Sequence, residues 1–479
     1  MQSIRINPLD NVAVMLDESS AEIPRGHKFA LRDIAAGENI IKYGMPIGRA
    51  TRGIRKGEHV HTQNMKTNLD GILEYSYEPV EIPVHPAAGT ETFSGFRRKN
   101  GSVGIRNHIF IIPTVGCVNK LAHTLAERLN RTLPAGSVDR AVAMEHPFGC
   151  SQLGGDHEMT RAILCGLVKH PNAGGVLVVG LGCENNTIDS FREKLGEIDS
   201  DRIKFLVSQK ESDEVAAGME ILNGLVRVAS QDVRTEIPVG ELVVGLKCGG
   251  SDGLSGITAN PLVGRFSDWL TARGGSTILS EVPEMFGAET ILMDRCKDEV
   301  TFRKAVDLIN NFKEYFIRHG QEVYENPSPG NKAGGITTLE DKSLGCTQKG
   351  GTAEVRDVLR YCEPVTEKGL NLVQGPGNDL CAITALMAAG AQMVLFTTGR
   401  GTPVGAPIPT VKVSTNTPLA EKKRDWIDFN AGILAQGADM QETTEVFFKK
   451  LLAIASGERT QSETHDYREI AIFKDGVTL

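Results

Sequence analysis

Short apolar runs that end in glycine-rich loops recur along most of this chain, and they constrain its fold more than any other feature. Residues 241–270 show the pattern most fully: an apolar run at 242–244, a loop of glycine and small polar residues at 248–260, then an apolar stripe at helical spacing. Such a run is typical of a strand buried on both faces. Strand, glycine loop and helix in this order build ligand sites beyond the carboxyl ends of strands in open α/β sheets.

The same pattern recurs after residue 96, where apolar runs alternate with amphipathic segments. Candidate strands lie at residues 108–117, 140–150, 174–184, 203–208, 276–282, 369–379 and 392–405. Apolar residues at helical spacing lie between them, as in the stripe of Phe302, Val306, Ile309, Phe312 and Phe316. This alternation predicts an α/β protein with a large, mostly parallel, Rossmann-like region. A break near residue 235 divides the region into two expected lobes, 96–235 and 236–479.

Residues 1–77 have a different pattern, which predicts a small all-β module. Short β-type runs, among them 12–16 and 39–41, alternate with turn sequences such as AAGE, YGMP and RKGE. Residues 78–95 are rich in proline and have no period, as is typical of a linker.

Composition argues against several classes of partner. The 479 residues carry a formal net charge of −8 without a dense lysine or arginine block, which argues against nucleic acid or an anionic membrane. No apolar run is long enough to span a bilayer, and the start, MQSIRINPLD, has no apolar signal core, so a cytoplasmic location is expected. A homodimer is one assembly that the sequence leaves open.

Three histidines of the β module are candidate metal ligands: His27 in GHKFA, and His59 and His61 in GEHVH. If EHVH is a strand, His59 and His61 point to the same face, because side chains alternate along a strand. Two imidazoles on one face with a third nearby suit a divalent cation. Surface or structural histidines are the alternative. As ligands, at least two of the three are expected to face a pocket between the module and the α/β body.

Three early strands end in cysteine, in the sequences TVGC, PFGC and GLGC, which contain Cys117, Cys150 and Cys183. Cys248 and Cys346 also lie in glycine-flanked segments. Thiols gathered at strand ends could ligate a soft metal or an iron–sulfur cluster. However, no CxxC pair exists, and cysteine also packs as a small hydrophobe. We expect the three strand-end cysteines to be structural or to line the substrate rather than to bind metal, and an odd total of nine cysteines does not suggest a disulfide framework.

Polar residues follow the same strands. They are His146, Glu184 and Asn185 beside the cysteines, and Ser251, Asp252 and Asn260 in the 248–260 loop. At strand ends such side chains could hydrogen-bond a polyhydroxylated ligand. Turn and helix capping use the same residue types, so both interpretations stay open.

Residues 326–351 form a long polar stretch that is almost free of apolar residues, which predicts a mobile loop or lid. Lys332 and Lys342 within it could meet an anionic substrate. Arg400, in the glycine turn TTGRGTPVG, suits a carboxylate clamp. A solvated loop without a catalytic residue and a bystander arginine are the alternatives.

The motifs of several enzyme classes are missing. There is no GxxxxGK[ST] or HExxH, and no GxGxxG between a strand and a helix. Nucleotide-driven chemistry is therefore disfavoured. What remains is metal-assisted chemistry on a small polar anion, or binding without a cofactor.

Several long motifs resemble the altronate/galactarate dehydratase family. They are RGHKFAL, GEHVHTQN, RNHIFIIPTVGCVN, FGCSQLGGDH, GLGCENN, CGGSDGLSGITANP, SEVPEMFGAE, NPSPGNKAGGITTLEDKSLGCTQKGG and TTGRGTP, and the resemblance covers essentially the whole chain. One departure is a short stretch between Leu16 and Arg25, where the chain is shorter than this family leads us to expect.

The resemblance implies an N-terminal SAF-type β module and a catalytic α/β region. It also implies dehydration of a sugar acid, D-altronate to 2-dehydro-3-deoxy-D-gluconate in hexuronate (galacturonate) catabolism, assisted by Fe²⁺ or Mn²⁺. Related acids such as galactarate, or sugar-acid binding without catalysis, are the alternatives. Neither the motifs nor their spacing identify the general base and acid.

The expected site combines these residues. The candidate catalytic residues are His146, Cys150, Glu184, Asp252, Lys332 and Lys342; the candidate substrate-binding residues are Asn185, Ser251, Asn260 and Arg400; and the candidate metal ligands are His27, His59 and His61.

Overall fold

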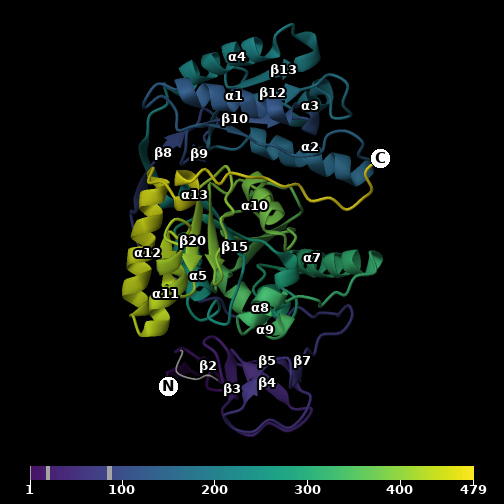
Figure 1. Ribbon diagram of the computed structural model, residues 1–479, viewed down its shortest axis with the longest axis vertical. Helices are drawn as coiled ribbons and strands as arrows, with labels where there is room; N and C mark the ends of the chain where they lie inside the picture. The colour runs from purple at the N-terminus through teal and green to yellow at the C-terminus, as the bar shows by residue number, and fades with distance from the viewer. Residues whose placement is uncertain (1, 18–21, 84–88) are drawn as a thin grey trace.

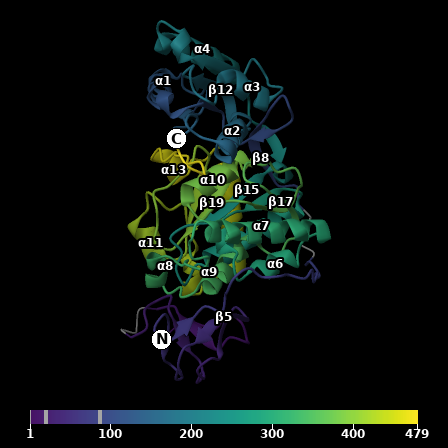
Figure 2. The same cartoon turned by 90° about the vertical axis from the view of Figure 1, so that its right-hand side faces the viewer.

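The chain folds into a β module at one end and two parallel sheets with their helices above it, as the computed structural model shows in Figures 1 and 2. The structure describes residues 2–17, 22–83 and 89–479. The shortened stretch that the sequence analysis placed between Leu16 and Arg25 includes residues 18–21, which lie outside the described residues. Each helix in the described part of the chain is too short or too polar to cross a lipid bilayer.

The β module consists of two small antiparallel sheets. The first has the order β1 (Ser3–Ile4), β2 (Val12–Met15), β3 (Lys28–Ala30) and β6 (His59–Val60), and the second β4 (Asn39–Lys42), β5 (Met45–Ala50) and β7 (Met65–Lys66). Val12, Ile40 and Ile47 are buried in its core, and Ala288 and Leu344 of the α/β body belong to the same apolar cluster. The module is therefore packed against the body by a shared core.

The first α/β lobe is a four-stranded parallel sheet with helices on both faces. Its order is β11 (Ala141–Ala143), β10 (His108–Pro113), β12 (Ala173–Gly180) and β13 (Ile203–Val207). Apolar residues of α1 (Asn119–Thr132) and α4 (Glu214–Ala229) pack on one face, and those of α2 (Gly154–Val168) and α3 (Ile188–Leu195) on the other. Strand residues alternate between the two clusters, as expected for a sheet covered on both sides.

The second lobe is built on a seven-stranded sheet in which every pair is parallel. Its order is β17 (Val355–Leu359), β18 (Leu370–Val373), β16 (Ser276–Leu279), β15 (Val243–Cys248), β19 (Met393–Thr398), β20 (Thr410–Ser414) and β21 (Phe429–Asn430). Its larger helices are α5 (Ala259–Ala272), α7 (Glu299–Arg318), α10 (Asp379–Ala388) and α12 (Met440–Ala455). Shorter helices are α6 (Glu289–Met293), α8 (Pro329–Ala333), α9 (Leu339–Cys346), α11 (Thr417–Lys422) and α13 (Gln461–Thr464).

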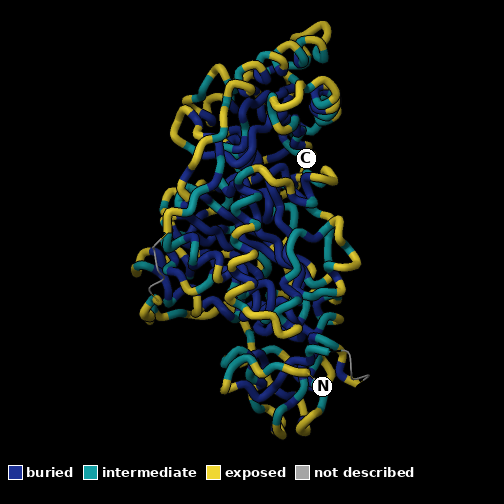
Figure 3. The backbone as a smooth tube through the Cα atoms, turned by 90° about the vertical axis from the view of Figure 1, so that its left-hand side faces the viewer, coloured by how far each residue is buried: buried dark blue, intermediate teal, exposed yellow. Residues whose placement is uncertain are grey.

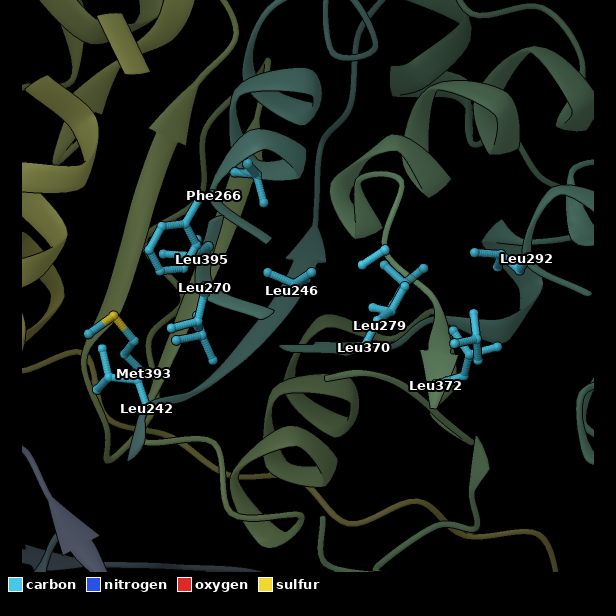
Figure 4. Close-up of a cluster of buried hydrophobic side chains, with 14 of the residues drawn as sticks. Leu242, Leu246, Phe266, Leu270, Leu279, Leu292, Leu370, Leu372, Met393 and Leu395 are labelled. Atoms are coloured by element: carbon cyan, nitrogen blue, oxygen red, sulfur yellow. The ribbon is translucent and has the colours of Figure 1, made fainter. Parts of the chain in front are cut away.

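Buried side chains fill the space between this sheet and its helices, and the two lobes share part of that core. Figure 4 shows Leu246, Leu279 and Leu395 of three strands near Phe266 and Leu270 of α5. Figure 3 shows buried residues, in dark blue, in both lobes and in the β module. A small antiparallel sheet of β14 (Thr235–Pro238), β8 (Thr92–Arg97) and β9 (Val103–Gly104) connects the lobes. The α/β class and the β module expected from the sequence are confirmed.

The position of β15 explains where a ligand site can form. The chain proceeds from β15 to β16 on one side, and later returns to β19 on the other side of β15. Ligand sites of open α/β sheets form at such a switch point, beyond the carboxyl ends of the strands. The glycine loop after β15 and the turn after β19 lie at this edge.

The prediction of a mobile loop at residues 326–351 is wrong. The segment forms α8, α9 and a 3₁₀ turn, η5 (Thr347–Gly350), and every residue from Gly335 to Thr347 is buried. Its small residues allow close packing, and two of its charged side chains, Asp341 and Lys342, are buried in ion pairs. Hydrophobic periodicity does not detect burial of this kind.

Backbone contact holds the module against the glycine loop, and this gives a first prediction. A Cβ at Gly253 would lie well inside 3.0 Å of the Gly26 carbonyl oxygen, so nothing larger than glycine fits there. We expect Gly253→Ala to lower the free energy of unfolding by about 1–3 kcal/mol, the usual effect of overpacking. Urea denaturation measures this change. Gly53→Ala is the matched control, because no atom lies within 4 Å of its Cβ position; equal stability of the two variants would contradict this account of the interface.

Candidate functional site

The three histidines of the β module come together at its junction with the body. His27 immediately precedes β3 and His59 begins β6, and these antiparallel strands pair Phe29 with His59. The ring centroids of His27 lie 5.1 Å from those of both His59 and His61, and the latter two stack at 5.6 Å. The Nδ1 atom of His27 lies 3.0 Å from the Nε2 atom of His59.

Contacts with the body orient two of these rings. His61 Nδ1 lies 2.8 Å from the Thr337 hydroxyl, and His27 Nε2 lies 3.4 Å from the Ala333 carbonyl oxygen. Burial lowers the pKa of His59 and of His61 to about 4 and also lowers the pKa of His27. All three imidazoles are therefore neutral at neutral pH, the form that binds metals.

A buried carboxylate beside the histidines forms ion pairs with two lysines of the β module. Asp341 accepts hydrogen bonds from Lys28 at 2.7 Å and Lys42 at 2.9 Å, and all three side chains are at most 2% exposed. Burial alone would raise the pKa of Asp341, but the two ammonium groups lower it. One carboxylate neutralises one of two cations, so this cluster has excess positive charge.

A second charged cluster lies at the carboxyl ends of β15 and β16. Lys247 pairs with Glu281 at 3.0 Å and with Asp379, and Glu281 also accepts from the Cys248 amide at 2.9 Å. Glu281 has φ of 68°, a left-handed conformation that is uncommon for a residue other than glycine. Backbone strain in a buried charged residue is typical of functional sites.

Glu284 connects this cluster to α9. Its carboxylate pairs with Lys342 at 2.7 Å and accepts from the Cys248 thiol at 2.9 Å, while Lys349 donates to the same sulfur at 2.9 Å. Burial alone would raise the pKa of Glu284, but Lys342 and Lys349 lower it to about 2. Within the described chain, one group of three His, Cys, Asp or Glu side chains has ligand atoms all within 4.8 Å: Cys248, Glu284 and Cys346.

A narrow cavity connects the two charged clusters. Its lining includes Lys42 and Asp341 from the first cluster, Lys342 from the second, and Ser251 and Asp252 from the glycine loop. Its volume is about 10 Å³, room for roughly one water molecule. A ligand larger than a water molecule does not fit into the cavity in this structure.

The glycine-loop residues predicted from the sequence line this cavity or support it. Asp252 accepts hydrogen bonds from Thr415 and Ser255, and burial raises its pKa. Ser251 is 2% exposed, and its hydroxyl has no partner among the described residues. Asn260 does not line the cavity itself, but its buried side chain links β19 to α9: it accepts from the Thr397 hydroxyl and donates to the carbonyl oxygen of Gly345, which lines the cavity.

The other predicted residues lie elsewhere. Arg400 is exposed in the turn after β19, and Lys332 is half-buried in α8. His146, Cys150, Glu184 and Asn185 lie together at the carboxyl edge of the four-stranded sheet, remote in sequence from the cavity residues. Four residues of the site were not predicted from the sequence: Lys28, Lys42, Glu281 and Glu284. The two glutamates follow the strand at 276–279 directly, and polar residues after a buried strand were the signal that could have found them.

Comparison with known proteins gives a consistent result over the whole chain. Residues 239–478 match the family described as D-galactarate/altronate dehydratase, C-terminal, residues 95–230 match the D-galactarate dehydratase/altronate hydrolase second domain, and residues 18–68 match the altronate/galactarate dehydratase SAF domain.

Individual relatives of the chain come from the same family. The chain is 53% identical to altronate dehydratase of Escherichia coli (strain K12), with 100% of both chains covered, and 56% identical to altronate dehydratase of Bacillus subtilis (strain 168), over 96% of this chain and 93% of the relative. Galactarate dehydratase (L-threo-forming) of Escherichia coli (strain K12) is 31% identical over 95% of this chain and 93% of its own.

Proposed function

The chain belongs to the altronate/galactarate dehydratase family, and from this premise we propose that it removes water from D-altronate to give 2-dehydro-3-deoxy-D-gluconate. The observation that carries the proposal is the identity above 50% to two altronate dehydratases over nearly the whole chain. The buried excess of positive charge beside the cavity supports it, because the substrate carries a carboxylate.

A divalent cation, Fe²⁺ or Mn²⁺, fits the three histidines. His27 Nδ1 and His59 Nε2 lie 3.0 Å apart and share one hydrogen between two neutral imidazoles, and a bound cation would take the place of that hydrogen. The hydrogen bonds of His27 and His61 to the body leave one nitrogen of each ring for a ligand bond, the usual arrangement around bound metals. The third ring must move somewhat to complete the set, since the three are not within the 4.8 Å limit met by the cysteine group.

The group of Cys248, Glu284 and Cys346 fits a cation less well, despite its spacing. Lys349 donates to the Cys248 sulfur, and Lys342 pairs with the Glu284 carboxylate. The two ammonium groups therefore already supply the positive charge that a metal ion would bring to these ligand atoms. Metal ligation requires thiolates. A hydrogen bond with Cys248 and burial raise the pKa of Cys346 well above its usual value, which keeps this thiol protonated.

The reaction needs charge stabilisation and two proton transfers. Removing the C2 proton next to a carboxylate builds negative charge, and a bound divalent cation supplies Lewis-acid stabilisation worth several kcal/mol. We assign the remaining work to residues of the cavity. Lys42 holds the substrate carboxylate and Asp252 accepts the C2 proton. Burial alone would lower the pKa of Lys342, but Glu284 raises it, so the Lys342 ammonium assists the departing C3 hydroxyl by donating a hydrogen bond and by its positive charge. A carboxylate whose pKa is raised by burial is a better base than an exposed one.

The test of this function is formation of a 2-keto acid by the purified, Mn²⁺-loaded protein. D-altronate and galactarate are supplied separately at equal concentration. Faster turnover of D-altronate supports the proposal, and faster turnover of galactarate favours the second substrate. Binding of either acid without product would instead indicate a non-catalytic binding protein.

Asp252→Asn tests the base directly. We expect kcat to fall by about 10²–10⁴-fold, the usual contribution of general base catalysis, with a smaller change in KM. In D₂O, exchange of the C2 hydrogen should be lost together with turnover. Wild-type exchange in a variant with a wild-type melting temperature would show that another residue removes the proton.

A further inference from the structure

Three cysteines lie on three neighbouring loops at the carboxyl edge of the four-stranded sheet. Cys117 follows β10 in η1 (Gly116–Val118), Cys150 follows β11, and Cys183 follows β12. These strands are adjacent and parallel, so their carboxyl ends meet at one edge. Cys117 and Cys183 are exposed, Cys150 is half-buried, and all three are free thiols. This edge is separate from the cavity to which we assign dehydration.

The loops are locked together by backbone contacts. Gly116 donates to the Phe148 carbonyl oxygen at 2.9 Å, and Asn186 donates from its backbone to Gly149 at 3.0 Å and from its side chain to Thr114 at 3.1 Å. Gly149 has φ of 102°, and a Cβ there would overlap the Thr114 carbonyl oxygen. The three cysteines are therefore held in fixed positions relative to one another.

Buried polar side chains maintain this arrangement. Glu184 accepts from Thr114 at 2.8 Å, from Leu181 at 3.1 Å and from Gly182 at 2.6 Å. The Nε2 atom of His146 lies 2.8 Å from the Pro113 carbonyl oxygen, and its Nδ1 atom accepts a hydrogen bond from the Phe148 amide at 3.2 Å. Both side chains use their polar atoms on the cysteine loops, so their role is positioning.

The edge also offers hydrogen-bond donors to a sulfur-rich group. Gln152 is 4% exposed and lies against the Cys150 loop, since its Oε1 accepts from Gly149 at 3.2 Å. Its Nε2 has no partner among the described residues, and a buried donor without a partner is costly. Gln209 donates from its Nε2 to the Cys183 sulfur at 3.4 Å. Hydrogen bonds to sulfurs tune iron–sulfur clusters.

The spacing of the thiols argues against a single ion held by all three. Sulfurs bound to one Zn²⁺-like ion lie about 2.3 Å from it and thus within about 4.6 Å of one another. In the described chain, Cys117, Cys150 and Cys183 do not form a group within 4.8 Å. A cluster of several irons holds its thiolates further apart.

We propose that Cys117, Cys150 and Cys183 bind a [4Fe–4S] cluster at this edge. Three thiolates are one fewer than the four that usually hold such a cluster, so one iron is open to solvent or to a small oxygen ligand. This assignment replaces the structural or substrate-lining role that we expected from the sequence.

The experiment uses the full chain, purified without oxygen, reconstituted with iron and sulfide, and loaded with Mn²⁺ to fill the histidine site. We expect about four irons and four acid-labile sulfides per chain, with broad visible absorption. Cys117→Ser, Cys150→Ser and Cys183→Ser should each lower the sulfide content by about tenfold or more. Cys381→Ser is the matched control, a partly exposed thiol in α10, and should keep the cluster.

Iron without labile sulfide in the wild-type protein would overturn the proposal, as would wild-type sulfide content in the three variants. Melting temperatures check that each variant is folded. His59→Ala separates this proposal from the proposed function, because it should lose Mn²⁺ and activity but keep the cluster.

Discussion

Replacing His59 by alanine is expected to abolish Mn²⁺-dependent turnover of D-altronate, with a loss of about 10³-fold or more. The Lewis-acid contribution is worth several kcal/mol, and each 1.36 kcal/mol corresponds to tenfold in rate. His59 supplies the Nε2 atom that lies 3.0 Å from His27 Nδ1, so its loss removes one of the two best-placed nitrogens. The variant should also lose bound metal on dialysis. Turnover rates and metal content are measured on the same preparation.

His123→Ala is the control for this experiment. His123 lies on α1 with a side chain that is 41% exposed and pairs with Glu145, remote in sequence from the module. We expect it to keep both metal and turnover. Full metal-stimulated activity in both His59→Ala and His61→Ala would place the metal elsewhere, and Cys248, Glu284 and Cys346 would become the next candidates.

Asp341→Asn is expected to lower the free energy of unfolding by about 3–5 kcal/mol, because it leaves two buried ammonium groups without their anion. Lys28 and Lys42 come from the β module and Asp341 from α9, so the loss falls on the junction between them. Urea denaturation at neutral pH, followed by tryptophan fluorescence and by circular dichroism, measures the change. Separate transitions for the two probes would indicate that the module detaches first.

The same carboxylate predicts a pH dependence. The pKa of Asp341 is lowered in the folded protein, so its contribution to stability is present above the unfolded-state pKa of about 3.9 and is lost as pH falls through the lower folded-state pKa. The stability difference between wild type and Asp341→Asn should therefore narrow below pH 3.9. Asp425→Asn, at a side chain that is 81% exposed, should change stability by less than about 0.5 kcal/mol at any pH. A wild-type denaturation midpoint for Asp341→Asn would contradict this account.

The sequence was a good guide wherever burial follows a regular period. The apolar stripe from Phe302 to Phe316 corresponds to α7, the run at 174–184 overlaps β12, and the run at 392–405 contains β19. The short strands β17, β20 and β21 were not predicted. β20 is completely buried, but its sequence, TVKVS, includes a lysine, a residue type that is usually exposed. Lys412 is buried because its ammonium donates to Ser462.

The candidate site was predicted only in part, for a related reason. The histidines and the glycine loop have recognisable local patterns. Lys28 and Asp341 do not, because each charge is buried only by virtue of a partner more than 300 positions away. The same long-range pairing turned a polar stretch that resembled a loop into the buried helix α9. Local sequence cannot show that two distant charges neutralise each other.

The most direct test of the central claim, a divalent cation held between the β module and the α/β body, is a crystal structure of the Mn²⁺-loaded protein with anomalous diffraction. We predict an anomalous peak about 2.0–2.2 Å from nitrogens of His27, His59 and His61. A peak bound by Cys248, Glu284 and Cys346, with the histidine nitrogens free of metal, would contradict it.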